Sequence, residues 1–572
     1  MGMKWGKAGV KVILLPLLLI VIMAGAQPAE PNLARLIQEA QAAIDRHDFK
    51  HAKVLSEQAL ALAGQLPGAA GAQVGDALTL SGQAESALGN HKTAQALLLR
   101  AVAIAESNSG TEHLQTAVAL HYLAETHSAL AQHQQALQIN QRVIAIRERA
   151  FGPVHLVVAA SLNNLAMNQA AMTHFVEAQA LHQRALAIRE KLLPPGDPLI
   201  AVSLHNLAAV LYQIGQYGRA SQLLQQALAF REKALAPEDP LIATSLSNLA
   251  LVETALGMPD KALPLRLRAL AIQEKTGGPE HPDTAALLNN LADNYAVLGR
   301  RDLALPLQLR SLSIHEKTLG PNHPATATSL NNLASTYGAM ASFDKALPLQ
   351  QRAAAIFEQT LGPEHLNLAG SLSNLATTYT RMGQFDKALP IRLRALAIYE
   401  KTLGPAHPNT AQMLNNLAQT HIALGQDALA VPLLERALAI REKALGPDHP
   451  GVAAVLNNLA AAHLAGGHPE QALPLQQRAL AIREKSLGAW HTDLAASLQT
   501  MAQIDVALGL PAQAMPLQQR ALSIYQNTSG PAHPNTALAL ASLAAMHLAL
   551  NERPFAITLL KQAVNNYQAM RE

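Results

Sequence analysis

The chain has 572 residues, of which 49% are hydrophobic and 15% charged, and it contains no cysteine. Disulfide bonds and lipid attachment at a cysteine are therefore excluded. The 43 basic and 40 acidic side chains become 40 against 40 once three lysines within residues 1–26 are set aside. Such a neutral chain has no general attraction to nucleic acid or to anionic lipid, so we expect no nucleic-acid partner.

Residues 1–26 have the three parts of a secretory signal peptide. Three lysines precede the apolar run Val12–Met23, and small residues at 24–26 provide a cleavage site. The alternative is an uncleaved membrane anchor. The apolar run is too short for this, since about 20 residues are needed to span a bilayer, and it contains Pro16. We therefore expect cleavage, no stable membrane insertion afterwards, and a periplasmic or secreted bacterial protein.

The rest of the chain repeats with a period of 42 residues, which is typical of a stacked solenoid. Residues 27–572 number 546, or thirteen times 42, so we expect no second domain. One alanine recurs at every step of this period, and another position of each unit also keeps a small residue, from Ala40 and Gly82 to Ala544. Small residues at two fixed points indicate close helix crossings. The main alanine column is Ala52, Ala94, Ala136, Ala178, Ala220, Ala262, Ala304, Ala346, Ala388, Ala430, Ala472, Ala514 and Ala556.

Each unit reads as two helices. In one unit Leu287, Leu291 and Tyr295 recur every four residues, which is the stripe of an amphipathic helix, and Gly299 ends it. A second apolar run reaches a Leu-Gly-Pro stop signal at residues 319–321. Seven units carry a proline that we expect near the first turn of the second helix, where a missing N–H matters least. These are Pro264, Pro306, Pro348, Pro390, Pro432, Pro474 and Pro516.

The unit A-x2-LNNLA-x2-Y-x3-G-x4-A-x6-A resembles the tetratricopeptide repeat. Its length of 42 residues, its Asn-Asn pair and its ALAIREK…LGPEHP tail are similar to the kinesin-light-chain type. The resemblance covers nearly all the chain after residue 30. It is specific for the fold, whereas this repeat serves many functions.

We therefore predict an all-α, right-handed superhelical solenoid of about thirteen antiparallel helix pairs, with the first helix of each pair lining the concave face. Residues 27–110 form divergent N-terminal units that act as a cap. Residues 111–530 form a core array of ten units, and residues 531–572 form a C-terminal capping unit. Divergent end units are expected because the ends of a solenoid meet solvent.

Histidines recur in the loops before the first helices. Metal binding is one interpretation, but such loops lie about 10 Å apart in stacked helix pairs, whereas zinc ligands lie about 2.1 Å from the ion. Asp197 and Asp239 replace histidine in two units and precede proline, which is typical of a helix N-cap. We therefore predict N-caps, no metal and no cofactor. The histidines are His113, His155, His281, His323, His365, His407, His449, His491 and His533.

An arginine recurs on the second helix. The acidic and basic residues that follow it, as at Arg441-Glu442-Lys443, predict a solvated, salt-bridged outer face. Anion binding is the alternative. The column is Arg100, Arg142, Arg184, Arg268, Arg310, Arg352, Arg394, Arg436, Arg478 and Arg520.

Asparagine recurs inside the first helix, where it is a poor helix former and must bond to something. In tetratricopeptide domains the matching position faces the groove and bonds the backbone of an extended peptide. Two alternatives stay open: a ladder between repeats, or identity left from duplication. The predicted peptide-binding residues are Asn164, Asn206, Asn248, Asn289, Asn290, Asn331, Asn332, Asn374, Asn415, Asn416, Asn457 and Asn458.

The predicted groove is lined by hydroxyls and amides, with Asp293 and Arg381 as rare charges. A neutral lining suits an internal segment of a protein in extended form. We find no catalytic constellation and predict a non-catalytic protein–protein interaction scaffold that binds an unidentified protein or peptide, in cell-envelope or secretion assembly. The alternative is a structural spacer, or a glycan-contacting subunit of an envelope polymer-export complex.

Overall fold

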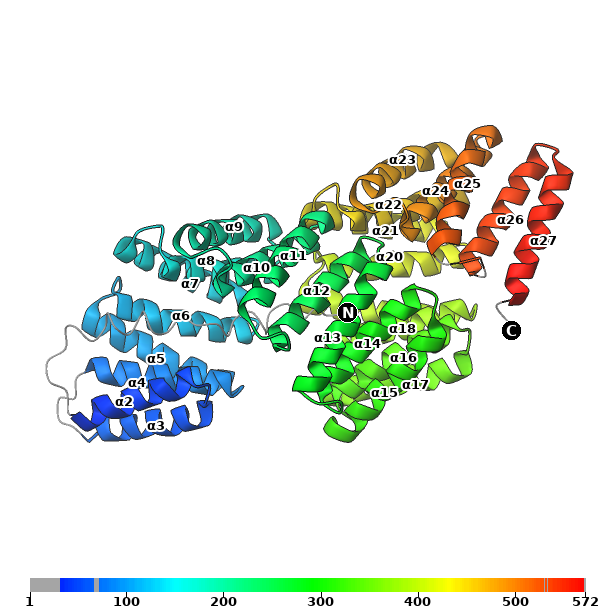
Figure 1. Cartoon of the computed structure of the whole chain (residues 1–572). Helices are drawn as coiled ribbons and strands as arrows, with labels where there is room; N and C mark the ends of the chain where they lie inside the picture. The colour runs from blue at the N-terminus through cyan, green and yellow to red at the C-terminus, as the bar shows by residue number, and fades with distance from the viewer. Residues whose placement is uncertain (1–30, 66–70, 529, 532, 570–572) are drawn as a thin grey trace. The chain divides into compact units, whose positions relative to one another are not determined.

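The computed structural model describes residues 31–65, 71–528, 530–531 and 533–569. Over these residues the regular structure is helical, without strands (Figure 1). The predicted signal peptide, residues 1–26, lies outside the described residues. None of the described helices has the length and apolar character required to cross a membrane. The chain divides into two compact units, residues 1–210 and 211–572.

The first unit holds the first four helix pairs and most of α10. Its helices are α2 (Pro31–Asp45), α3 (Phe49–Ala63), α4 (Gly71–Ala87), α5 (His91–Ser109), α6 (Leu114–Ala129), α7 (His133–Phe151), α8 (Leu156–Ala171), α9 (Phe175–Leu192) and α10 (Pro198–Gln213).

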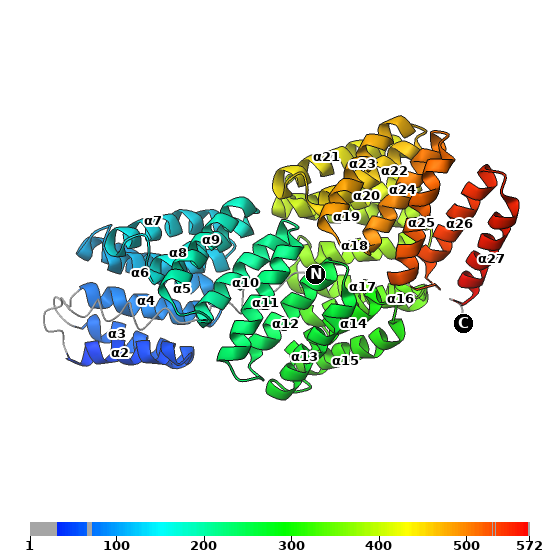
Figure 2. The same cartoon turned by 45° about the horizontal axis from the view of Figure 1, so that its top comes forward.

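The second unit begins near the end of α10 and continues the same alternation of helices (Figure 2). Its helices are α11 (Tyr217–Ala234), α12 (Pro240–Ala255), α13 (Pro259–Thr276), α14 (Pro282–Val297), α15 (Arg301–Leu319), α16 (Pro324–Ala339), α17 (Phe343–Leu361), α18 (Leu366–Arg381), α19 (Phe385–Leu403), α20 (Pro408–Ala423), α21 (Asp427–Leu445), α22 (Pro450–Ala465), α23 (Pro469–Ser486), α24 (Thr492–Ala507), α25 (Pro511–Thr528), α26 (Pro534–Ala549) and α27 (Arg553–Ala569).

These helices make thirteen pairs, which confirms the predicted all-α repeat array. Many of the helices end at a glycine with positive φ, as at Gly299 between α14 and α15 (φ 75°) and Gly320 after α15 (φ 96°). Glycine adopts this backbone conformation without the steric penalty of a Cβ atom. The pairs therefore begin and end where the local sequence signals lie.

The alanine column packs at the helix crossings. All thirteen of its members have no exposed surface, as close helix packing requires. Gly82, in the second small column, is tighter still, because a Cβ atom there would lie 2.6 Å from Cγ of Leu98. The predicted role of the small residues is confirmed.

The prediction for the seven prolines is wrong by about one turn. Pro306 is the sixth residue of α15, and the other six prolines also occupy the sixth position of their helices. Each therefore lies in the helix interior, where proline removes one N–H donor from the hydrogen-bond ladder. The error arises because the second helices begin a few residues earlier than the apolar pattern indicates.

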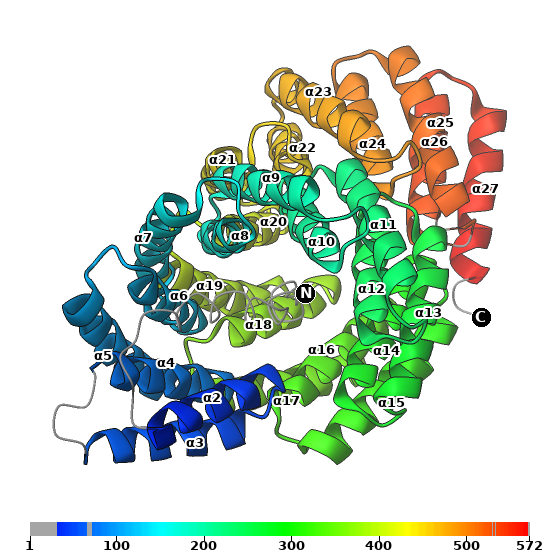
Figure 3. The same cartoon turned by 60° about the vertical axis from the view of Figure 1, so that its left-hand side comes forward.

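The first helix of each pair lies on the inner side of the stack in the second unit. Successive first helices contact each other, as α14 does α16, α16 does α18, and α22 does α24. Successive second helices of the described chain have no contacts of comparable extent. Helices that approach more closely lie on the inside of a curve, so α14, α16 and α18 present their free faces inward (Figure 3).

Segments far apart in sequence also meet within the second unit. Nε2 of His449 lies 3.0 Å from the backbone oxygen of Gln213. One period further on, a Cβ atom at Gly257 would lie 2.9 Å from the ring of His491. Burial lowers the pKa of His449 to about 4. The loops before α22 and α24 therefore pack against turns more than five repeats earlier.

Candidate peptide-binding face

The loop histidines are N-caps, as predicted. In each of the nine, Nδ1 accepts a hydrogen bond from the backbone N–H two residues later, at 2.8–3.3 Å. Asp197 and Asp239 accept the equivalent bond at 2.8 Å through a carboxylate oxygen. Among the described residues no three His, Asp or Glu side chains come together as a metal site would require.

The arginine column forms an exposed ladder of ion pairs. Each member from Arg268 to Arg520 pairs with a glutamate 36 residues earlier, as Arg310 does with Glu274 at 2.7 Å. The predicted salt-bridged outer face is confirmed, but the partner belongs to the preceding repeat. The prediction is wrong for Arg441, which was placed in a solvated run of charges. This residue is only 9% exposed, and its side chain donates to the backbone oxygen of Gly451.

Eight of the twelve predicted asparagines bond to a side chain of a neighbouring repeat. The bonds join Asn164 to Glu125, Asn206 to Asn163, Asn289 to Ser329, Asn331 to Ser371, Asn415 to Asn458, Asn416 to Ser373, and Asn457 to Ser497. Their distances run from 2.8 to 3.3 Å. These amides form a ladder between repeats.

Three asparagines in successive repeats are different. Asn290 on α14 and Asn332 on α16 are partly exposed, and Asn374 on α18 is exposed. Within the described part of the chain their side-chain amides have no hydrogen-bond partner, although the backbone oxygens of Asn290 and Asn374 accept bonds from Arg266 and Gln350. Asn248 is also partly exposed. The structure thus brings three free amides together on the inner side of α14–α18.

A column of buried polar side chains on the second helices was not predicted. Nη1 of Arg147, Arg189 and Arg483 donates to a serine hydroxyl fourteen residues later at 2.6–2.7 Å, as Arg231 also does. These guanidiniums are at most 5% exposed, and burial lowers their pKa. Their 42-residue spacing was the available signal, but the neighbouring Glu and Lys suggested a surface.

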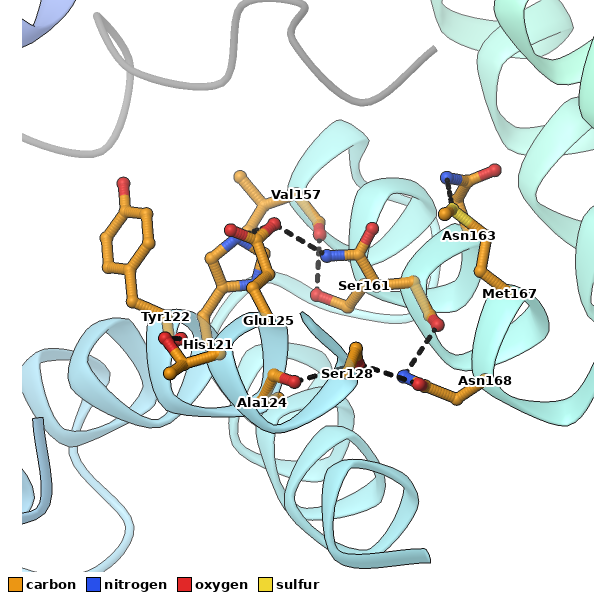
Figure 4. A network of polar contacts seen from close by, with 12 residues as sticks. His121, Tyr122, Ala124, Glu125, Ser128, Val157, Ser161, Asn163, Met167 and Asn168 are labelled. Atoms are coloured by element: carbon orange, nitrogen blue, oxygen red, sulfur yellow. Dashed lines mark hydrogen bonds and ion pairs between the residues drawn. The ribbon is translucent and has the colours of Figure 1, made fainter. Parts of the chain in front are cut away.

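A polar network joins α6 and α8 (Figure 4). Nε2 of His121 lies 3.5 Å from Oε1 of Glu125, which also accepts a bond from Asn164 at 3.2 Å. Burial raises the pKa of Glu125 to about 7 and lowers that of His121 to about 3. The Glu125 side chain is nevertheless 37% exposed, so solvent reaches this carboxyl although protein surrounds it. Near neutral pH the contact is a hydrogen bond more than an ion pair.

Asp293 on α14 occupies the same register as Glu125, four repeats later. Burial raises its pKa to about 6, opposed by the positive charge of Arg266 on α13. It lies one turn from Asn290 on the inner side of the helix. An acidic group therefore accompanies the three free amides.

We expect Asp293→Asn to stabilise the second unit near neutral pH. The raised pKa means that the folded state disfavours the carboxylate, so stability falls as pH rises from about 4 through about 6. Removing the charge should raise the free energy of unfolding by about 2 kcal/mol at about pH 7.5 and by almost nothing at about pH 4. Urea unfolding at both pH values measures this. Exposed Asp302→Asn is the control, and an equal gain at both pH values would contradict the argument.

The comparisons with known proteins agree with this architecture. The model of the tetratricopeptide repeat matches residues 73–149, 115–191, 157–233, 241–300, 285–359, 331–391, 367–443, 422–485 and 493–569. The chain belongs to the tetratricopeptide repeat family. Its repeats are of the kinesin-light-chain type, as predicted. Proteins built from this repeat act as interaction scaffolds, and the scaffold class applies to this chain.

Three solved structures illustrate the similarity. The TPR-like repeats of a putative kinesin light chain from Podosopora anserina are 32% identical, over 36% of this chain and 97% of that chain, with a TM-score of 0.32. BtubC (BKLC) from P. vanneervenii is 26% identical over 40% and 92%, with a TM-score of 0.34. The APC/C hetero-tetramer Cut9-Hcn1 is 15% identical over 96% and 95%, with a TM-score of 0.42. The curated proteins gave no match.

Proposed function

We propose that the inner side of α14, α16 and α18 holds an extended peptide segment of a partner protein. The observation that carries this proposal is the set of free amides at Asn290, Asn332 and Asn374. A side-chain amide offers both a donor and an acceptor, which are what a peptide backbone requires. At four other positions of the same register, Asn164, Asn206, Asn416 and Asn458, the amide instead bonds a side chain of a neighbouring repeat.

The spacing of the repeats suits this ligand. Packed helices lie about 8–10 Å apart, and an extended chain rises about 3.3 Å per residue. Successive amides would therefore meet every third residue of the peptide. Such recognition is directed at the backbone, so it tolerates variation in the side chains of the ligand.

The charges beside the amides restrict the ligand further. The positive charge of Arg266 acts on Asp293 and lowers its pKa against the larger effect of burial, so charges of both signs lie in this region. A strongly charged peptide would gain little here, whereas an internal segment without a free carboxylate fits. No constellation for catalysis enters this proposal, and the chain is proposed as a non-catalytic scaffold.

The test is the triple variant in which Asn290, Asn332 and Asn374 are changed to alanine. We expect this variant to bind the partner segment at least tenfold more weakly than the native chain does, because each lost hydrogen bond costs about 1 kcal/mol. A photoreactive amino acid at position 332 of the native chain would identify the bound segment. Binding is then measured by titration with that synthetic segment.

The matched control replaces Arg310, Arg352 and Arg394 by alanine, since these residues lie on the outer helices of the same repeats. It should bind as the native chain does. Undiminished binding by the asparagine variant, with its helicity intact, would refute the proposed face.

We also propose that the chain acts outside the bacterial cytoplasm, in cell-envelope or secretion assembly. The support is the signal pattern of residues 1–26. Amino-terminal sequencing of the protein from its native cells should find Gln27 first. A protein that retains Met1 in the cytoplasm would contradict export.

A further inference from the structure

The last described repeat ends in an apolar surface. On α26, Leu538 and Leu548 are 50% and 47% exposed. On α27, Ile557, Leu560 and Val564 are 52%, 41% and 54% exposed. The three on α27 recur along one helical stripe, and a solvent-facing end repeat would not be expected to carry such an apolar surface.

On α27 this is the surface that earlier repeats bury against the next one. Gln518 and Leu522 stand one period before Leu560 and Val564, and they are only 0% and 9% exposed. The side chain of Gln518 donates to the backbone oxygen of Ala539 on α26, at 3.0 Å. By the same register, Leu560 and Val564 point to where a further helix would pack.

On α26 the polar groups that join repeats are absent. In an earlier repeat Asn415 accepts a hydrogen bond from Asn458 of the next repeat at 2.8 Å. Ala541 stands at the register of Asn415. Leu538 and Leu548 stand one period after Ala496 and Val506, which are partly exposed and 37% exposed although another repeat follows them. The end of the array therefore lacks the polar contact at Ala541 on α26, and its uncovered apolar side chains lie on α27.

The first described helix has a different character. Arg35 on α2 stands at the register of Ser161, which later repeats bury, and it pairs with Glu39 at 2.9 Å. The two side chains are 73% and 45% exposed. Stacking another copy on α2 would bury this ion pair, which is unfavourable. Head-to-tail growth of the array is therefore disfavoured.

We propose that a second copy of this chain covers the α26–α27 end face through a two-fold axis. The end face comprises Ala541 on α26 and Ile557, Leu560 and Val564 on α27. A two-fold arrangement sets apolar surface against apolar surface and closes after two copies, so it does not build a fibre. It also continues the stacking that buries this register in the preceding repeats.

The size of the end face sets the expected affinity. Two helices about 25 Å long and about 10 Å apart present about 500 Å² per copy. This lies at the lower end of specific interfaces, so we expect a dissociation constant on the order of 10 µM.

Sedimentation equilibrium of the chain from about 1 to 100 µM tests the proposal. We expect a concentration-dependent dimer, and at least tenfold weaker association for the double variant Leu560→Gln with Val564→Gln. Val176→Gln, on the surface of α9 and 74% exposed, is the matched control and should leave association unchanged. A native chain that stays monomeric throughout, or a double variant that associates normally, would overturn the proposal.

The absence of cysteine permits a second test of the geometry. We place the two-fold axis beside Leu560, the middle of the three exposed apolar residues of α27, so Leu560→Cys should give covalent dimers under mild oxidation. Val176→Cys should give none. A dimer that Leu560→Cys cannot link would overturn the placement of the axis beside Leu560. A chain that stays monomeric, and whose double variant loses a different bound protein, would assign the face to that protein.

Discussion

Replacing Arg483 by alanine is expected to lower the free energy of unfolding around α23 and α24 by about 3 kcal/mol. The guanidinium is 5% exposed and donates to Oγ of Ser497 at 2.6 Å and to the backbone oxygen of Asp493 at 2.7 Å. Alanine leaves these acceptors without their donor and opens a cavity. Urea unfolding, together with hydrogen exchange of the amides in α23 and α24, measures the loss.

Two comparisons show that burial is the reason. Arg478→Ala removes an arginine of the exposed ladder on the same helix, 40% exposed beside Glu442, and should change stability by less than about 1 kcal/mol. Arg483→Phe should be milder than alanine, because Phe357 already fills this register in α17. Equal losses for Arg483→Ala and Arg478→Ala would contradict a buried role.

Ala346→Leu should be comparably damaging, with an expected loss of about 3 kcal/mol or a failure of α17 to pack. Ala346 has no exposed surface, and it belongs to the column found at all thirteen helix crossings. Three added carbon atoms have no space there, so the two helices of the pair must separate. Thermal unfolding followed by circular dichroism measures the loss.

Ala355→Leu is the control for this prediction. Ala355 lies on the same helix but is exposed, so its substitution should stay within about 0.5 kcal/mol of the native chain. A tolerated leucine at position 346 would show that the alanine column does not set the helix spacing.

Much of the fold could be predicted because its signals are local and repeated. The alanine period gave the repeat length, and the His-Pro and Asp-Pro pairs correctly marked the first residues of the inner helices. The prolines were misplaced because the sequence does not mark the first residue of the second helices clearly. Pro306, for example, is the sixth residue of α15. The divisions at residues 110 and 530 stay predictions.

The candidate site was less predictable because it depends on neighbours across repeats. Asn331 and Asn332 are adjacent and of one residue type, yet Asn331 bonds Ser371 while the amide of Asn332 bonds no described residue. Arg441 and Arg436 are five residues apart on α21, yet one is buried and the other pairs with Glu400 on the surface. In each case the outcome depends on which side chain of the adjacent repeat faces the asparagine or arginine.

By itself the sequence determined the helix pairs, their number, their caps and the small residues at their crossings. These features depend on contacts within a single helix pair and on a period that recurs along the chain. Only the tertiary structure decided which polar groups are used between repeats, which remain free at Asn290, Asn332 and Asn374, and which apolar groups stay uncovered at Leu560 and Val564. The physical reason is that hydrogen bonding and burial here depend on the offset between stacked units, and identical residues in different repeats meet different partners.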